Sequence, residues 1–419
     1  MSTVPAALAV IVVCALLPYL PFLLIPLFSD DYIQIALGRQ YGPLDQWGSL
    51  AQDVLYRCRA TSIVLTHLMD RLAGDAPLPL RVLNLAVHAL AALLVAGLGS
   101  WKRIGYRISV PAAAFFALRE AHQEAVIWVA ALPELLAFVF VLATVLAWIR
   151  WMDTRRTLWA WASCAAFLLG LLSKESAAVF PAFAFLIWWL DARSWRTPLV
   201  VIAAMLSMDG LYAGSIFAAK DAHLHLNDGT FRFQSGFAWT LLHSMLRMMW
   251  PWGAIAAALL AWSGFERWRS YAIGAFVWMA VALLPYSFLT YMDRVPSRHT
   301  YLASVGIAIL MGCAWQTLER LRRPAVIGLA LAAVLIHNLG YLWTKKFDQY
   351  QRRVEPTEHF LRYAETRSGP VRITCAPYGV DVYRQAAAIR LGWPPQQVLG
   401  PEDISPAGEP SNYCDTSKP

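Results

Sequence analysis

Long stretches without a charged side chain recur along this sequence as far as about Trp343. The first of them, from Pro5 to Phe28, contains no Asp, Glu, Lys or Arg. About 20 apolar residues in a helix cross the ~30 Å hydrocarbon core of a bilayer, so such runs constrain the fold more than any other feature. A backbone in lipid must pair its own polar groups, which favours helices. We therefore predict an all-α polytopic membrane protein.

Composition agrees with a membrane protein and excludes some functions. The chain has 419 residues, 58% of them hydrophobic, and a mean hydropathy of +0.47. The net charge of +8 is spread over many short turns, so we expect no nucleic-acid partner. A glycine-rich nucleotide loop is not apparent. Because "MSTVP" has no basic residue and the run that follows is long, we expect the first segment to be a retained helix, not a signal peptide.

The apolar runs predict about eleven membrane crossings. Turns with several Lys or Arg residues alternate with turns that have few, and the positive-inside rule places the basic turns in the cytosol. We therefore expect a cytosolic N-terminus and an extracytoplasmic chain after Lys345, and the lack of an N-x-S/T sequon favours a bacterial inner membrane. The predicted spans lie near residues 5–28, 80–100, 108–120, 133–150, 157–172, 176–190, 198–217, 239–262, 271–290, 301–317 and 325–343. The basic turns carry Lys102, Arg103 and Arg107, Arg150, Arg155 and Arg156, Arg193 and Arg196, Arg267 and Arg269, and Arg320, Arg322 and Arg323.

Two parts of the chain differ in composition. We predict a transmembrane body over residues 1–343, with a first extracytoplasmic loop at 29–79, and a small extracytoplasmic α/β domain over 344–419. In this C-terminal domain, "DQYQRRVEPTEHFLRYAE" predicts a helix broken near Pro356, "VRITCAP" a strand and "DVYRQAAAIRLGW" a second amphipathic helix. Cys375 and Cys414 can form a disulfide in an oxidising compartment or remain two free thiols.

The external turns hold most of the polar residues that are useful for chemistry. "SDDY" follows the first span, "RATSIVLTHLMDRLAG" is too short and charged to cross and predicts a surface helix, and "LLSKESAAVFP" interrupts an apolar stretch. Ionisable residues near membrane depth are costly and often mark a site. Each has a structural alternative, since Asp30 and Asp31 can cap a helix and Lys174 can pair with Glu175 at a turn. Because such residues occur on several external loops, we favour one shared extracytoplasmic site.

Several stretches together resemble a known family. They are "SDDY", "YRCRATSIVLTHLMDRLAG", "LRVLNLAVHALAALLVA", "REAHQEAVIWVAALPELLAFVF", "LLSKESAAVFPAFAFL" and "SRHTYLASVG", which cover most of residues 29–310. In this order they resemble the membrane-embedded C-type (GT-C) glycosyltransferases. The most similar branch contains the protein O-mannosyltransferases and the transmembrane mannosyltransferases with tetratricopeptide tails. This chain departs from that branch because its C-terminal part lacks a 34-residue repeat, "AHQ" replaces the family's "HP", and Ser297 stands where an acid often precedes Arg298.

The resemblance implies a GT-C fold and transfer of a sugar from a polyprenyl-phosphate carrier, with inversion, to an acceptor hydroxyl outside the cytosol. The enzyme would be a hexosyltransferase, with mannose as one candidate sugar, and the acceptor a glycan, lipid or protein. It implies no cofactor and no metal. Asp30 is the first candidate for the base that activates the acceptor hydroxyl and Asp31 the second. Candidates for binding the donor phosphate are Arg298, Lys174, Arg57 and Arg59, and candidates for the substrate pocket are His122, Glu124, Glu134 and Glu175.

Other interpretations remain open at this point. A secondary transporter or flippase for a lipid-linked or anionic substrate would also place ionisable residues in the membrane, although we find no inverted repeat. A non-catalytic scaffold with the same fold is a third possibility. "DAHLHLND" brings His223 and His225 near Asp221 and Asp228 in a weak metal-site pattern, and the polar side chains of an ordinary surface loop explain it equally well. We expect His88 to form a hydrogen bond between helices.

Overall fold

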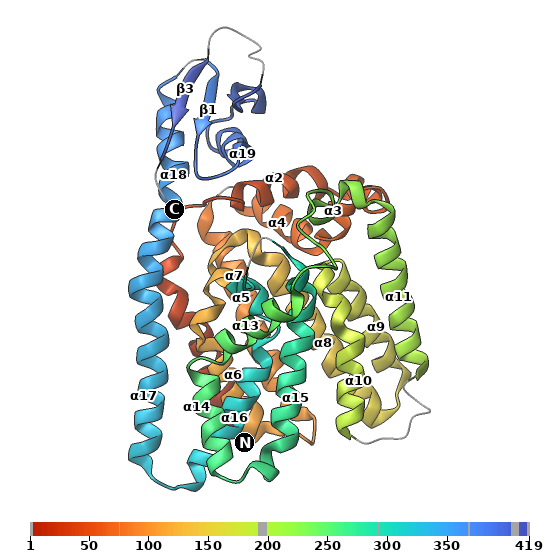
Figure 1. Cartoon of the computed structure of the whole chain (residues 1–419). Helices are drawn as coiled ribbons and strands as arrows, with labels where there is room; N and C mark the ends of the chain where they lie inside the picture. The colour runs from red at the N-terminus through yellow and green to blue at the C-terminus, as the bar shows by residue number, and fades with distance from the viewer. Residues whose placement is uncertain are drawn as a thin grey trace.

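The computed structural model describes residues 3–74, 76–191, 199–290, 293–367, 369–403 and 410–416. Helices form the body, and a small domain with three strands stands at one end of it (Figure 1). This confirms the all-α polytopic fold with a small α/β cap. Six segments are long and apolar enough to cross a membrane by themselves: Val4–Phe22, Pro77–Ser100, Val129–Thr154, Leu199–Ala218, Phe265–Phe288 and Pro324–Glu365.

Each predicted span corresponds to helical structure in the described residues. The helices are α1 (Thr3–Leu16) with η1 (Leu17–Phe22), α5 (Pro77–Gly97), α6 (Tyr106–Leu118), α8 (Leu132–Thr154), α9 (Thr157–Leu171), α10 (Phe180–Asp191), α11 (Leu199–Ala218), α13 (Phe237–Met249) with α14 (Trp252–Trp262), α15 (Phe265–Leu283), α16 (Ser304–Arg320) and α17 (Pro324–Tyr341).

One predicted span is wrong in detail. Residues 239–262 were expected to form a single helix, but the structure has α13 and α14, separated at Pro251. Proline has no backbone N–H and disfavours helical geometry in the residue before it, and Trp250 is accordingly extended with ψ of 136°. The helix therefore ends at Met249 and a new one begins at Trp252.

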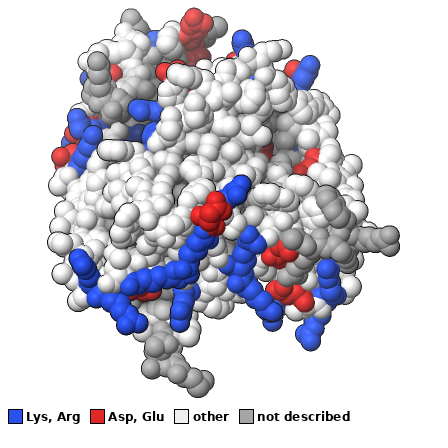
Figure 2. Space-filling view, turned by 60° about the horizontal axis from the view of Figure 1, so that its bottom comes forward, with Lys and Arg blue, Asp and Glu red and all other residues white. Residues whose placement is uncertain are grey.

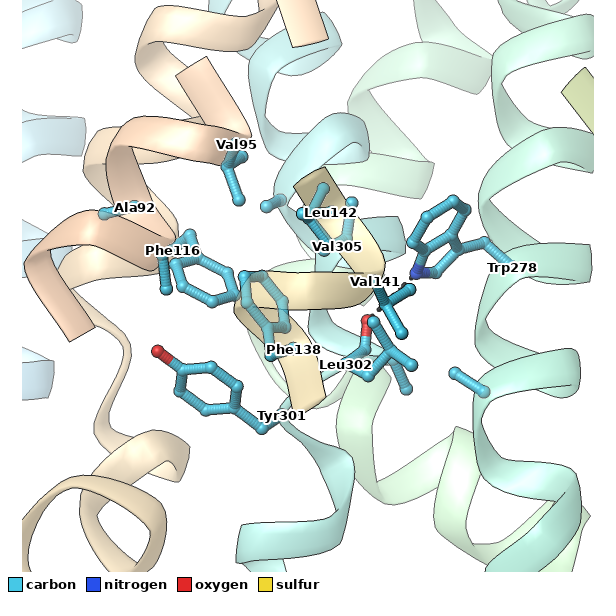
Figure 3. Close-up of a cluster of buried hydrophobic side chains, with 14 of the residues drawn as sticks. Ala92, Val95, Phe116, Phe138, Val141, Leu142, Trp278, Tyr301, Leu302 and Val305 are labelled. Atoms are coloured by element: carbon cyan, nitrogen blue, oxygen red, sulfur yellow. Dashed lines mark hydrogen bonds between the residues drawn. The ribbon is translucent and has the colours of Figure 1, made fainter. Parts of the chain in front are cut away.

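A buried apolar cluster fixes the packing of the central helices. Phe116 of α6, Phe138 of α8 and Tyr301, just before α16, point toward one another (Figure 3). On the other side of this cluster, the indole nitrogen of Trp278 donates to the backbone oxygen of Leu302 at 2.9 Å. Apolar surface gives little net drive between helices in lipid, so close packing and such hydrogen bonds carry much of the helix association.

The segment predicted to be the first extracytoplasmic loop forms a layer across one end of the bundle (Figure 1). Its elements are α2 (Asp31–Tyr41), η2 (Leu44–Ala51), α3 (Val54–Arg57) and α4 (Ala60–Ala73). Arg39 of α2 donates two hydrogen bonds to Asp70 of α4, at 2.9 and 2.8 Å, and Gln34 bonds to Thr66 at 3.0 Å. The surface helix predicted from "RATSIVLTHLMDRLAG" is α4, so that prediction is confirmed.

The last transmembrane helix continues into the cap. α17 passes through a π-helical turn (Leu342–Lys346) into α18 (Phe347–Glu365). The predicted break near Pro356 is wrong, because this proline lies inside α18. A proline within a helix costs about one backbone hydrogen bond and some strain. Buried Val354 and Phe360, on either side of the proline, provide packing that offsets this cost.

The cap contains a parallel sheet with the order β2-β1-β3. Its strands are β1 (Val371–Cys375), β2 (Val398–Leu399) and β3 (Ser411–Cys414), and α19 (Val380–Arg390) follows β1. The predicted strand and second helix are confirmed, and Cys375 and Cys414 form a disulfide. Apolar residues of the cap and of α2 share one buried cluster, which includes Ile35 and Phe360. The boundary between residues 343 and 344 stays a prediction.

Basic side chains gather on the face opposite the cap. Figure 2, which brings the lower end of the molecule in Figure 1 forward, shows rows of Lys and Arg on it. This agrees with the predicted cytosolic side, although the orientation itself stays a prediction. Arg193 and Arg196 lie outside the described residues.

Candidate active site

The two adjacent aspartates have different surroundings. Asp31 is fully buried and accepts backbone hydrogen bonds from Phe28 at 3.3 Å and from Ala130 at 3.0 Å, while the guanidinium of Arg81 lies 4.0 Å away. Asp30 is half-buried at the N-terminus of α2, but its side chain does not cap the helix. Its carboxylate has one long contact, 3.5 Å from the Ser29 hydroxyl. Asp31 therefore holds the loop in place, and Asp30 remains available for chemistry.

A second acid lies on α7 (Gln123–Ile127) and is paired with Arg298. The guanidinium of Arg298 is 2.7 Å from Glu124, and the hydroxyl of Ser297 donates to the same carboxylate at 2.8 Å. The guanidinium also lies 4.9 Å from the ring centroid of Trp128. Ion pair and aromatic face together fix the orientation of Arg298, while 23% of its side chain stays exposed.

The residue after Arg298 belongs to a neighbouring cluster. The ring of His299 and the ammonium of Lys174 both contact the carboxylate of Glu134, which also accepts a 2.8 Å hydrogen bond from Tyr286. Lys174 lies 5.4 Å from the Tyr286 ring centroid. This carboxylate therefore holds the lysine in a defined position.

A third cluster begins at the residue after Lys174. Glu175 accepts a hydrogen bond from Arg59 at 2.7 Å and lies 3.1 Å from His223. Since Arg298 precedes His299 and Lys174 precedes Glu175, the three clusters are linked through neighbouring residues. They form one continuous set of ionisable groups from five separate segments of the chain.

Burial and charge shift the protonation of these groups. Burial raises the pKa of Asp30, and the positive charge of Arg298 lowers it in part. Burial raises the pKa of Asp31 to about 6, against the opposing effect of Arg81. Burial, the largest effect, disfavours the charged form of Glu124, but the charges of Arg298 and Arg353 and the hydrogen bonds from the Ser297 hydroxyl and the Arg298 backbone together outweigh it and hold the pKa of Glu124 below its usual value. Glu124 is therefore held as an anion, whereas burial favours protonation of Asp30.

Two of the sequence candidates have other roles in the structure. His122 is fully buried, bonds to the Ser304 hydroxyl at 2.8 Å and packs against Tyr301. Burial lowers its pKa well below the usual value, so it is a neutral core residue. The guanidinium of Arg57 donates to three backbone oxygens, of Leu50, Ala51 and Ser215, at 2.9 to 3.2 Å. Arg57 thus ties η2 to α11.

The histidines of "DAHLHLND" do not converge on one point. His223 bonds to Glu175, whereas His225 bonds to the Thr230 hydroxyl at 2.9 Å. Ligand atoms of Cys58, Glu175 and His223 lie within 4.8 Å of one another, which a metal ion could use. Arg59 already neutralises Glu175, and this ion pair explains the cluster without a metal. As expected, His88 joins helices, with a 2.6 Å hydrogen bond to Tyr301 and a 3.1 Å contact to the Ala117 oxygen.

Some residues of the site were not predicted. His299 follows Arg298 in "SRHTY", so the motif itself offered a signal for it. Tyr286 and Arg81 lie in apolar segments, and only their tertiary contacts show that they bear on Glu134 and Asp31. Trp128 also has a part in the site, since it stacks on Phe28 and its ring faces the guanidinium of Arg298.

Comparison with solved structures identifies the class of fold. The chain has the GT-C fold of membrane-embedded glycosyltransferases. It is similar to ArnT from Cupriavidus metallidurans, solved with bound undecaprenyl phosphate, with a TM-score of 0.57 and 14% identity over 95% of this chain and 90% of ArnT. It is also similar to the Archaeoglobus fulgidus oligosaccharyltransferase tethered to an acceptor peptide, with a TM-score of 0.51 and 12% identity over 94% of this chain and 63% of that enzyme. No protein-family profile and no curated protein matches the sequence.

Proposed function

We propose that this protein is a glycosyltransferase that moves a sugar from a polyprenyl-phosphate carrier to an acceptor hydroxyl on the extracytoplasmic side of a bacterial inner membrane, with inversion at the anomeric carbon. The observation that carries the proposal is the half-buried carboxylate of Asp30 within electrostatic reach of Arg298, a cation that Glu124 holds in place. The shared fold with ArnT, which was solved with undecaprenyl phosphate, supports a lipid-linked donor. A hexose such as mannose remains one candidate for the sugar.

In this mechanism Asp30 is the general base. The acceptor hydroxyl donates its proton to Asp30 as its oxygen attacks the anomeric carbon, and the bond from that carbon to the phosphate oxygen breaks. Attack from the face opposite the leaving group inverts the configuration. The proton ends on Asp30 and the electron pair on the polyprenyl phosphate.

The cations stabilise the leaving phosphate. Charge on the phosphate increases as the bond breaks, and preorganised cations stabilise the transition state more than the ground state. Lys174 and Arg298 are held by Glu134 and Glu124, respectively, so no large reorganisation is needed. Arg59 is a third candidate, at the far end of the same set.

The test uses purified protein in nanodiscs and a radiolabelled polyprenyl-phosphate sugar. Asp30→Asn removes proton acceptance but keeps shape, so transfer should fall by ~10²-fold or more with donor binding unchanged. Lys174→Gln should weaken both donor binding and turnover. A wild-type protein that binds no donor, or an Asp30→Asn variant that keeps transfer within a few-fold, would contradict the proposal and favour a transporter or scaffold.

A further inference from the structure

Lys346, Tyr350 and Arg353 share one face of the long helix that joins the body to the cap. Their spacing of four and three residues places them one above another on a helix. Tyr350, the middle residue, is buried and donates a hydrogen bond to the side chain of Gln123 on α7. The face that carries both cations is thus turned toward the helix that carries Glu124.

Among the residues that the structure describes, these cations have no acidic partner. Arg353 lies 5.3 Å from the Tyr350 ring centroid, and the ammonium of Lys346 donates to the amide oxygen of Gln349 at 2.8 Å. On α13, Arg247 donates to the backbone oxygen of Val295 at 3.3 Å, close to Ser297. In the described part of the chain, no carboxylate lies within ion-pair distance of these three cations. Glu124, whose charge acts on Lys346 and Arg247, is already paired with Arg298 at 2.7 Å.

The position of this group indicates the kind of ligand. Lys346 ends the π-helical turn that follows α17. α17 is an apolar helix whose Leu329 and Ile336 side chains are 71% and 73% exposed, as expected of a helix that faces lipid. The cations therefore lie at the depth of lipid head groups. Positive charge is normally depleted from the extracytoplasmic side. These cations flank Tyr350, whose ring packs against Phe28 in the loop that leads to Asp30, with the ring centroids 5.6 Å apart, so their presence there indicates an anionic ligand. Basic residues at a bilayer surface attract anionic lipids.

We propose that Lys346, Arg353 and Arg247 bind the anionic head group of a lipid acceptor and hold it beside Asp30. This inference rests on the proposed function, because it assigns these cations to the acceptor, whereas Lys174 and its neighbours bind the donor. The lipid tails would lie along α17, and the head group would reach the site between α18 and α13. An acceptor hydroxyl on that head group can then approach the carboxylate of Asp30.

The experiment measures two ligands separately on the full chain in neutral detergent. The probes are phosphatidic acid, with phosphatidylcholine of the same chains as reference, and undecaprenyl phosphate, each quantified by native mass spectrometry. The double variant Lys346→Gln with Arg353→Gln removes two charges from the proposed site. The matched control, Arg352→Gln with Arg362→Gln, removes two charges from exposed positions of the same helix.

We expect the site variant to lose its preference for phosphatidic acid by about tenfold or more, and the control to change less than about twofold. Undecaprenyl phosphate binding should stay unchanged in both and fall in Lys174→Gln. Equal loss in site variant and control, or unchanged phosphatidic acid binding, would overturn the inference. Loss of undecaprenyl phosphate together with phosphatidic acid would assign the cations to the donor and overturn it too. Failure of the wild type to bind undecaprenyl phosphate would instead count against the proposed function alone.

Discussion

Asp30 and Asp31 are chemically identical, but the structure gives them different tasks. Asp31 binds two backbone N–H groups and lies near the buried Arg81, so replacing it leaves a buried cation with less compensation. We expect Asp31→Asn to lower the free energy of unfolding by about 1–3 kcal/mol. Asp30→Asn should leave it within about 0.5 kcal/mol, because the Asp30 carboxylate lacks strong contacts. Thermal unfolding in detergent measures both, and equal destabilisation would contradict this assignment.

The charge of Arg298 also sets a pH dependence. The base must be ionised, so transfer should fall as pH drops through the pKa of Asp30, which burial raises and Arg298 partly lowers. Arg298→Gln removes the lowering charge and leaves Glu124 as a second unpaired anion, and both changes raise the pKa of Asp30. The acid limb of the kcat/KM profile should therefore move to higher pH in this variant. A shift to lower pH would show that another group controls the limb.

At the scale of elements, two glycines on transmembrane helices differ in how closely a neighbouring helix packs against them. A Cβ at Gly312 of α16 would lie 2.3 Å from the backbone oxygen of Ile108, whereas at Gly328 of α17 it would meet nothing within 4 Å. Gly312→Leu should therefore separate α16 from α6 and destabilise the protein by about 1–3 kcal/mol or more, and Gly328→Leu should be nearly neutral. Thermal unfolding of the two variants tests this, and similar melting temperatures would refute the packing argument.

Element by element, the apolar spans could be read from the sequence because lipid imposes the same length and polarity on each crossing. Proline was a less reliable guide: Pro251 separates two helices that were expected to be one, and Pro356 lies within a helix that was expected to break. The effect of each proline depends on the packing around it. Which of Asp30 and Asp31 is the candidate base could not be decided from the sequence for a similar reason. The backbone N–H of Ala130, which donates to Asp31, lies 99 residues away in the sequence.

The whole molecule makes a prediction about orientation. The cap and the candidate site lie at one end and the basic turns at the other (Figures 1 and 2). In cells, a membrane-impermeant maleimide should label Asp221→Cys from outside and should label Arg156→Cys only after the membrane is opened. Both positions are exposed. Labelling of both from the same side would reject the proposed orientation.

The π-helical turn at Leu342–Lys346 sets the rotation of α18 and the cap about the helix axis relative to α17. A π turn contains one residue more than an α turn, and each residue rotates a helix by about 100°. Deleting one residue from it would turn α18 and the whole cap by about that angle. Tyr350 would then leave Gln123, and the apolar cluster shared by Phe360 and Ile35 would separate. The length of this turn therefore fixes one rotational orientation of the cap relative to the body, the one in which the cap faces the candidate active site.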